Sequence, residues 1–201
     1  MDTVREAFTE AAEAFVSAVA DLTTDDWDLP GLGEWSVRDL VGHTSRALST
    51  AAACLDRPTA GVQIPDAAAY YATAASAVDP RDVADRGRAA GVALGADPVA
   101  TVTDLAARSV ARVAAAPHGL TVTTVVGGMR FEDYLQTRVL ELTVHGLDLL
   151  VATGQQPQLP DRPLRLTLHL LAELALRAGT GSDVALSLAG RRGLPPGFSV
   201  L

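Results

Sequence analysis

The chain has 201 residues, and 48 % of them are hydrophobic, which is enough apolar material for the core of one large domain. Its formal net charge of −8 argues against a nucleic-acid surface, because such a surface needs a clustered basic face. The sequence has no run of about 18 apolar residues and no N-terminal stretch with the layout of a signal peptide. We therefore expect a protein without a membrane span, located in the cytoplasm.

The first half of the chain is predicted to be helical. An apolar stripe at helical spacing predicts a helix over residues 2–24, and a loop rich in proline and glycine follows it. Ser36 then opens the S-x-x-D pattern of a capping box, which predicts a second helix that runs to about Leu55. Further helices are predicted over residues 66–79, 81–95 and 98–116. Gly87 and Gly91 are expected to weaken the second of these.

The pattern changes after residue 119. Residues 120–126 are rich in β-branched side chains, and we interpret Gly127-Gly128 as the two-residue turn of a small β-hairpin. A long helix is predicted to begin near Phe131 and to end at about Gly154. A proline-rich connector then leads to a last helix, residues 164–177, and to an irregular tail. The fold class is therefore predicted to be mainly all-α.

The long helix carries the first functional signal. Leu140, Val144, Leu147 and Val151 recur at helical spacing and predict an apolar side that packs into a core. Glu141 and His145 lie four residues apart, so a carboxylate and an imidazole can meet one helical turn apart. This pair offers half of a metal site. The alternative is a polar surface pair that contributes only a few tenths of a kcal/mol.

A third ligand is available from the second helix. His43 lies among apolar residues and is expected to point toward the interior of a helical bundle or its mouth. In such bundles, side chains projected inward from different helices can build a metal site. His43, Glu141 and His145 would supply two imidazoles and a carboxylate, a set that suits zinc or a similar divalent ion. For His43 alone, a structural core histidine is the competing interpretation.

Other polar residues are weaker candidates. Asp39 precedes His43 by one helical turn and could orient its imidazole as a hydrogen-bond acceptor, although an acidic residue in a first turn also favours the helix dipole. Asp148 has the same two interpretations beside His145. We interpret His118 as a solvated loop residue. The single cysteine, Cys54, lies in an apolar run and is interpreted as a packed thiol rather than a nucleophile.

Two segments resemble a known family. GEWSVRDLVGHTSR contains His43, and RVLELTVHGLDLLVATG contains Glu141 and His145. Together they resemble the metal-binding domain of the mycothiol-dependent maleylpyruvate isomerases, which belongs to the DinB-like superfamily. The resemblance implies that residues 1–155 form a four-helix bundle with these three side chains as ligands of a divalent metal, usually zinc. Residues 156–201 would then be a C-terminal extension, either a reduced second domain or a terminal addition.

The resemblance also implies a chemistry and its partners. A metal-activated thiolate of mycothiol would attack a small electrophile, as an S-transferase, or would add to a cis double bond and leave after rotation, as an isomerase. Arg81, Arg86 and Arg88 are candidates for contacting an anionic substrate or cofactor, with ordinary surface arginines as the alternative. Two other functions stay open, a metal-dependent hydrolase and a non-catalytic metal-binding bundle. We also consider a homodimer, without an assigned interface.

Overall fold

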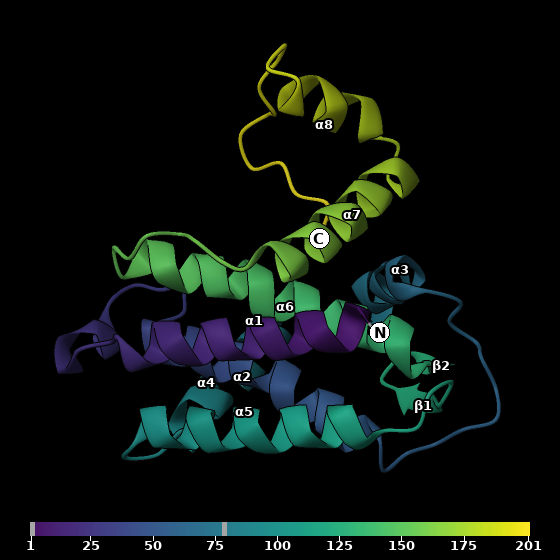
Figure 1. The fold of residues 1–201 in the computed structure, drawn as a ribbon. Coiled ribbons are helices and arrows are strands. Elements are labelled where there is room, and N and C mark those ends of the chain that lie inside the picture. The colour runs from purple at the N-terminus through teal and green to yellow at the C-terminus, as the bar shows by residue number, and fades with distance from the viewer. Residues whose placement is uncertain (1–2, 78–79) are drawn as a thin grey trace.

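The computed structural model describes residues 3–77 and 80–201, most of which are helical (Figure 1). The first half contains α1 (Thr3–Ala20), the short 3-10 helix η1 (Thr24–Asp28), α2 (Val37–Cys54), α3 (Ala67–Ala77), α4 (Pro80–Ala93) and α5 (Pro98–Ala115). The second half contains strands β1 (Thr121–Thr124) and β2 (Gly127–Arg130) and helices α6 (Phe131–Ala152), α7 (Asp161–Arg177) and α8 (Gly181–Leu188). The prediction of a mainly helical fold with a small hairpin is confirmed.

Four helices, α1, α2, α5 and α6, form the central bundle. Helix α1 packs against α5 and α6, and α2 packs against the same two helices. Large apolar side chains of these helices fill the interior, among them Phe8, Phe15, Leu48 and Leu142, each at most 1 % exposed. The remaining helices cover this bundle: α4 lies on α2, while α3 and α7 lie on α6. Helix α8 contacts α7 and stands away from the bundle (Figure 1).

Helix α6 is buried on more than one side. Leu135, Val139 and Leu149 point into the main core. Leu140, from the predicted apolar stripe, instead joins a second cluster between α3, α6 and α7, and Val144 packs against that cluster. Val151, the last member of the stripe, is 67 % exposed. The predicted packing of this side into a core is therefore confirmed for Leu140 and Val144, whereas Val151 lies outside the core.

Two glycines that were expected to weaken α4 allow it to approach α2 closely. A Cβ atom at Gly91 would lie 2.8 Å from Oδ1 of Asp39, and one at Gly87 would lie 2.6 Å from the ring of Trp35. Opposite them on α2, a Cβ atom at Gly42 would collide with the backbone of α4 at Gly91. The absence of side chains at these positions therefore sets the distance between the two helices.

Replacing Gly42 with alanine is expected to lower the free energy of unfolding by about 1–3 kcal/mol, the usual cost of overpacking. The higher helical propensity of alanine would by itself raise the free energy of unfolding by about 1 kcal/mol. The collision outweighs this gain because it is with backbone atoms, which no rotamer change can move away. Urea unfolding measures the difference. Gly61→Ala is the matched control, because a Cβ atom there meets nothing within 4 Å. A Gly42→Ala variant as stable as the control would contradict this account of the packing.

The hairpin has a different turn from the predicted one. Val125 and Val126 form the turn, and Gly127 and Gly128 belong to β2, where they pair with Thr124 and Thr123. A Cβ atom at Gly128 would collide with the carbonyl oxygen of Gly61, so the glycine permits the loop before α3 to lie against the hairpin. The glycine pair thus serves a close contact rather than a turn.

The C-terminal region is more regular than predicted. Helix α8 forms within the expected irregular tail, and the end of the chain returns toward α7 (Figure 1). Val200 packs against the cluster formed by α3, α6 and α7. Among the described residues, no helix has both the length and the apolar character required to cross a bilayer.

Candidate metal centre

Three potential ligands from two helices converge beside the core. His43 comes from the second turn of α2, and Glu141 and His145 come from successive turns of α6. One ligand atom from each residue lies within 4.8 Å of the other two. Nε2 of His145 is 3.4 Å and Nε2 of His43 is 3.9 Å from the same carboxylate oxygen, Oε2 of Glu141. Each of these side chains is 15–21 % exposed, so the cluster is largely shielded but open to solvent.

The carboxylate of Glu141 is held in place from α3. The hydroxyl group of Tyr71 donates a hydrogen bond of 2.8 Å to Oε1 and leaves Oε2 directed at the two imidazoles. Burial alone would raise the pKa of Glu141, but its contacts with His145 and His43 and the charge of Arg138 hold it well below its ordinary value. The carboxylate is therefore ionised and available as an anionic ligand at neutral pH.

His145 is oriented by the carboxylate of Asp148 on the next turn of α6. Nδ1 of His145 lies 3.0 Å from Oδ2 of Asp148. When Nδ1 carries the proton of that hydrogen bond, the lone pair of a neutral ring lies on Nε2, which faces Glu141. A carboxylate behind a histidine ligand is a recurring arrangement in metal sites, because it orients the ring and increases its basicity. Of the two interpretations of Asp148, the structure favours this one.

His43 is positioned by packing rather than by a carboxylate. Its ring lies against that of Trp35, with centroids 4.5 Å apart, and Trp35 is fastened to α4 by a 3.1 Å hydrogen bond from Nε1 to the carbonyl oxygen of Ala84. Nδ1 of His43 is buried and has no hydrogen-bond partner among the residues that the structure describes.

The expected role of Asp39 as the acceptor for His43 was wrong. Its carboxylate accepts a hydrogen bond from the backbone N–H of Ser36, while the hydroxyl of Ser36 accepts one from the backbone N–H of Asp39. These two bonds form the predicted capping box, and they occupy the carboxylate at the start of α2. The competing interpretation, an acidic residue in a first turn, is the correct one.

The donor set fits a divalent cation. Two imidazoles and one ionised carboxylate converge, and the hydrogen bonds of Tyr71 and Asp148 direct the remaining donor atoms toward one another. Three protein ligands also leave a coordination position for an exogenous molecule.

The metal-free protein is expected to lose stability as the pH rises. Burial would lower the pKa of His145, but Asp148 and Glu141 raise it from 6.5 to about 9. Because the pKa is higher in the folded state, protonation stabilises the fold fully below pH 6.5, and this contribution is lost as the pH rises through 9. Urea unfolding of chelator-treated protein should therefore show a loss of up to about 3 kcal/mol over this interval. The His145→Ala variant should show a flatter profile, and identical profiles would refute this assignment.

The other candidates from the sequence lie on α4, in the loop after α5 and at the end of α2. Arg88 forms an exposed ion pair with Glu34, and Arg81 is exposed on α4. Arg86 is also on α4, but it lines a cavity against α2. His118 is exposed in the loop after α5. The predicted packing of Cys54 is confirmed: the residue is 6 % exposed, and burial raises the pKa of its thiol to about 12.

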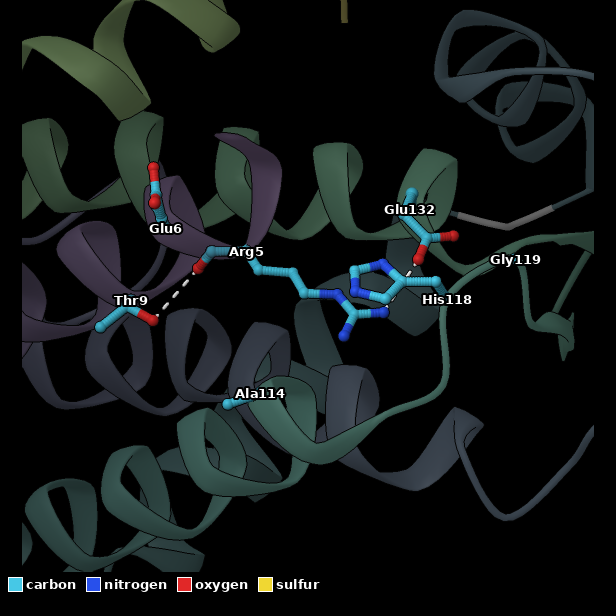
Figure 2. A pocket seen from close by; sticks show the side chains of 7 residues that line it. All are labelled: Arg5, Glu6, Thr9, Ala114, His118, Gly119 and Glu132. Carbon is cyan, nitrogen blue, oxygen red and sulfur yellow. Dashed lines mark hydrogen bonds and ion pairs between the residues drawn. The ribbon is translucent and has the colours of Figure 1, made fainter. Parts of the chain in front are cut away.

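A second, larger cavity of about 680 Å³ lies between α1, the end of α5 and the start of α6 (Figure 2). Arg5 extends across it and donates to Glu132, at 2.9 Å, and to the carbonyl oxygen of Ala116, at 2.6 Å. Glu132 precedes Glu141 by nine residues on α6, which corresponds to about 14 Å of helix. This cavity is therefore distinct from the three donors, and its arginine ties α1 to α5 and α6.

Sequence reasoning missed Tyr71 and Trp35 as parts of the site. Trp35 belongs to GEWSVRDLVGHTSR, one of the two segments that resemble the family, but the sequence alone did not indicate what its side chain does. Tyr71 carries no local signal, because its contact with Glu141 depends on how α3 packs against α6.

Together, the fold and the donor cluster define a helical-bundle protein with a site of two histidines and one glutamate between two of its helices. Within this class the family can be assigned. The family model described as the mycothiol maleylpyruvate isomerase N-terminal domain matches residues 8–150, and the chain belongs to this family. The match includes His43, Glu141 and His145. Neither the curated proteins nor the solved structures contain a match to the chain.

Proposed function

We propose that the protein is a metal- and thiol-dependent enzyme that acts on a small electrophile. In this proposal His43, Glu141 and His145 hold a divalent cation, preferably zinc, and mycothiol is the thiol substrate. The observation that carries the proposal is the convergence of these three donors within 4.8 Å, inside the segment that matches the family.

When bound, the cation supplies Lewis-acid chemistry that lowers the pKa of a thiol, so that thiolate forms at neutral pH. The protein residues provide the conditions for that chemistry. Tyr71 and Asp148 hold Glu141 and His145 in fixed orientations, which reduces the reorganisation needed when a ligand arrives. Trp35 covers one face of His43 and limits the access of water from that side.

The nucleophile must come from outside the chain. Cys54 is the one cysteine of the sequence, and its buried, protonated thiol is unsuited to attack. In the proposed reaction the external thiol loses its proton to solvent, and its sulfur forms a bond to an electrophilic carbon. In an S-transferase the attacked carbon would lose its leaving group, such as the chloride of an aryl chloride, and the thioether would be released as product. In an isomerase the C–S bond would form as the carbon–carbon π bond opens. After rotation about that bond the C–S bond would break, the double bond would form again, and the released thiolate would take up a proton from solvent.

We assign this chemistry to residues 1–155 and propose that residues 156–201 are an extension. Helix α7 of that extension packs against α1 and α6 and thus supports the helix that carries Glu141 and His145. A cytoplasmic location accords with the proposal, because low-molecular-weight thiols are kept reduced there.

Consumption of a generic electrophile such as chlorodinitrobenzene by zinc-loaded protein, with and without mycothiol, tests the proposal. We expect turnover that requires the thiol and is lost in His43→Ala. His169→Ala is the matched control, because His169 is an exposed histidine on α7. Hydrolytic activity without thiol would favour a metal-dependent hydrolase instead. Zinc binding without any turnover would favour a non-catalytic bundle.

A further inference from the structure

A cavity of about 400 Å³ lies between α2, α4 and α5. Small and apolar residues of α4, of α5 and of the turn between them form much of its wall: Ala89, Ala90, Ala93, Leu94 and Leu105. From α2 it is lined by Gly42, which directly precedes His43, and by Ser45, Arg46 and Ser49. The volume is within the range of small-molecule sites, about 300–1,000 Å³.

Two arginines line this cavity from opposite helices. Arg46 of α2 is half-buried, and Arg86 of α4 is exposed. Among the residues that the structure describes, neither has a carboxylate within ion-pair distance, whereas Arg88, two residues after Arg86, contacts both Asp85 and Glu34. Burial lowers the pKa of Arg46, and the positive charges of Arg86 and of Arg138 on α6 lower it further. The guanidinium groups therefore repel one another without a counter-charge.

The hydroxyl groups in the wall are already engaged. Ser45 donates to the carbonyl oxygen of Val41 at 2.8 Å, Ser49 to that of Arg46 at 3.2 Å, and Thr101 to that of Leu94 at 2.9 Å. The donors left for a ligand are thus the N–H groups of Arg46 and Arg86. Guanidinium groups recognise carboxylates through paired, charge-assisted hydrogen bonds, and the apolar wall suits a hydrocarbon body.

We propose that this cavity binds a small organic carboxylate, with its anionic head between Arg46 and Arg86 and its apolar body against the alanine and leucine side chains of α4 and α5. Any anion bound there removes the repulsion between the two guanidinium groups. A carboxylate with a hydrocarbon body also covers the apolar wall, which an inorganic anion such as phosphate leaves in contact with water. The site does not depend on the proposed metal chemistry, because none of the three candidate metal ligands lines the cavity.

Calorimetric titration of the full-length protein with hexanoate tests this site. Saturable binding is expected, with the neutral isostere hexanamide binding at least about tenfold more weakly, because it lacks the charge-assisted hydrogen bonds. Arg86→Gln should weaken hexanoate binding by about tenfold or more, and its exposed position makes loss of the fold an improbable cause. Arg46→Gln should act in the same direction. Arg88→Gln is the matched control on the same helix and should bind hexanoate like the parent protein.

The titration is repeated on chelator-treated and zinc-loaded protein to separate this site from the candidate metal centre. If hexanoate binds the chelator-treated and zinc-loaded forms with equal affinity, its binding site does not include the metal. Loss of binding on removal of zinc would overturn the proposal, because hexanoate would then be a metal ligand. Equal binding of hexanamide, unchanged binding in Arg86→Gln, or no saturable binding would also overturn it, and none of these results bears on thiol-dependent turnover.

Discussion

Replacing Glu141 with alanine is expected to weaken zinc binding by roughly a thousandfold. Zinc sites in small protein domains have apparent binding free energies of about 10–16 kcal/mol, so removal of one of three protein ligands should cost roughly 4 kcal/mol. Glu141 is the ligand for which this loss should be largest, because its carboxylate is the anion of the set and its Oε2 atom faces both imidazoles. Competition with a chromogenic chelator measures the affinity.

Two further variants keep the Glu141 experiment interpretable. Glu13→Ala removes an exposed glutamate of α1 and should bind zinc like the parent protein. Glu141→Gln keeps the size of the side chain and an oxygen that can accept the hydrogen bond from Tyr71, so it separates loss of charge from loss of packing. Zinc affinity that stays unchanged in both Glu141 variants would show that the donor cluster is a structural polar group.

Asp148→Asn is expected to weaken zinc binding by about 10- to 100-fold, although Asp148 is not among the three proposed ligands. The substitution keeps the shape of the side chain but removes the charge that orients Nδ1 of His145 and makes its ring more basic. Tyr71→Phe, which removes the hydrogen bond to Oε1 of Glu141, should act in the same direction. The chelator competition assay measures both variants.

Asp39→Asn is the informative control for Asp148→Asn. Both residues are close to a histidine in sequence, but the carboxylate of Asp39 caps α2 through Ser36. Asparagine can still accept the hydrogen bond from Ser36, so the Asp39 variant should lose only the favourable charge in the first helical turn, about 0.3–1 kcal/mol of stability, and should bind zinc normally. If Asp39→Asn weakened zinc binding as much as Asp148→Asn, the assignment of Asp148 as the residue that orients a ligand would be wrong.

The grouping of His43, Glu141 and His145 could be anticipated from the sequence because part of it is local. A separation of four residues places Glu141 and His145 on one side of a helix whatever the rest of the chain does. His43 required an additional argument, since spacing does not determine which helices face each other. The resemblance of two motifs to one family supplied that argument.

Contacts between distant segments could not be anticipated in the same way. Tyr71 meets Glu141 only because α3 packs on α6, and no periodicity in α3 indicates which side chain will reach across. The glycines of α4 show the same limit: propensity alone makes Gly87 and Gly91 unfavourable in a helix, whereas the structure uses them for close packing. The local rule holds, but a tertiary contact outweighs it.

Asp39 shows how two local interpretations can compete. The S-x-x-D pattern predicts a capping box, and the same carboxylate was also considered as an acceptor for His43. A carboxylate that is held at the helix terminus by a backbone N–H cannot also reach the imidazole one turn later. The capping prediction was therefore already an argument against the second role.

The central claim is that the three donors hold a cation to which an external thiol can bind. Cobalt substitution tests it most directly, because a thiolate ligand on cobalt(II) produces a sulfur-to-metal charge-transfer absorption. Titration of cobalt-loaded protein with mycothiol should produce this band, saturating at one thiol per chain, and chelator-treated His43→Ala should not develop it after addition of cobalt. A parent protein that binds cobalt but shows no such band with mycothiol would contradict the claim.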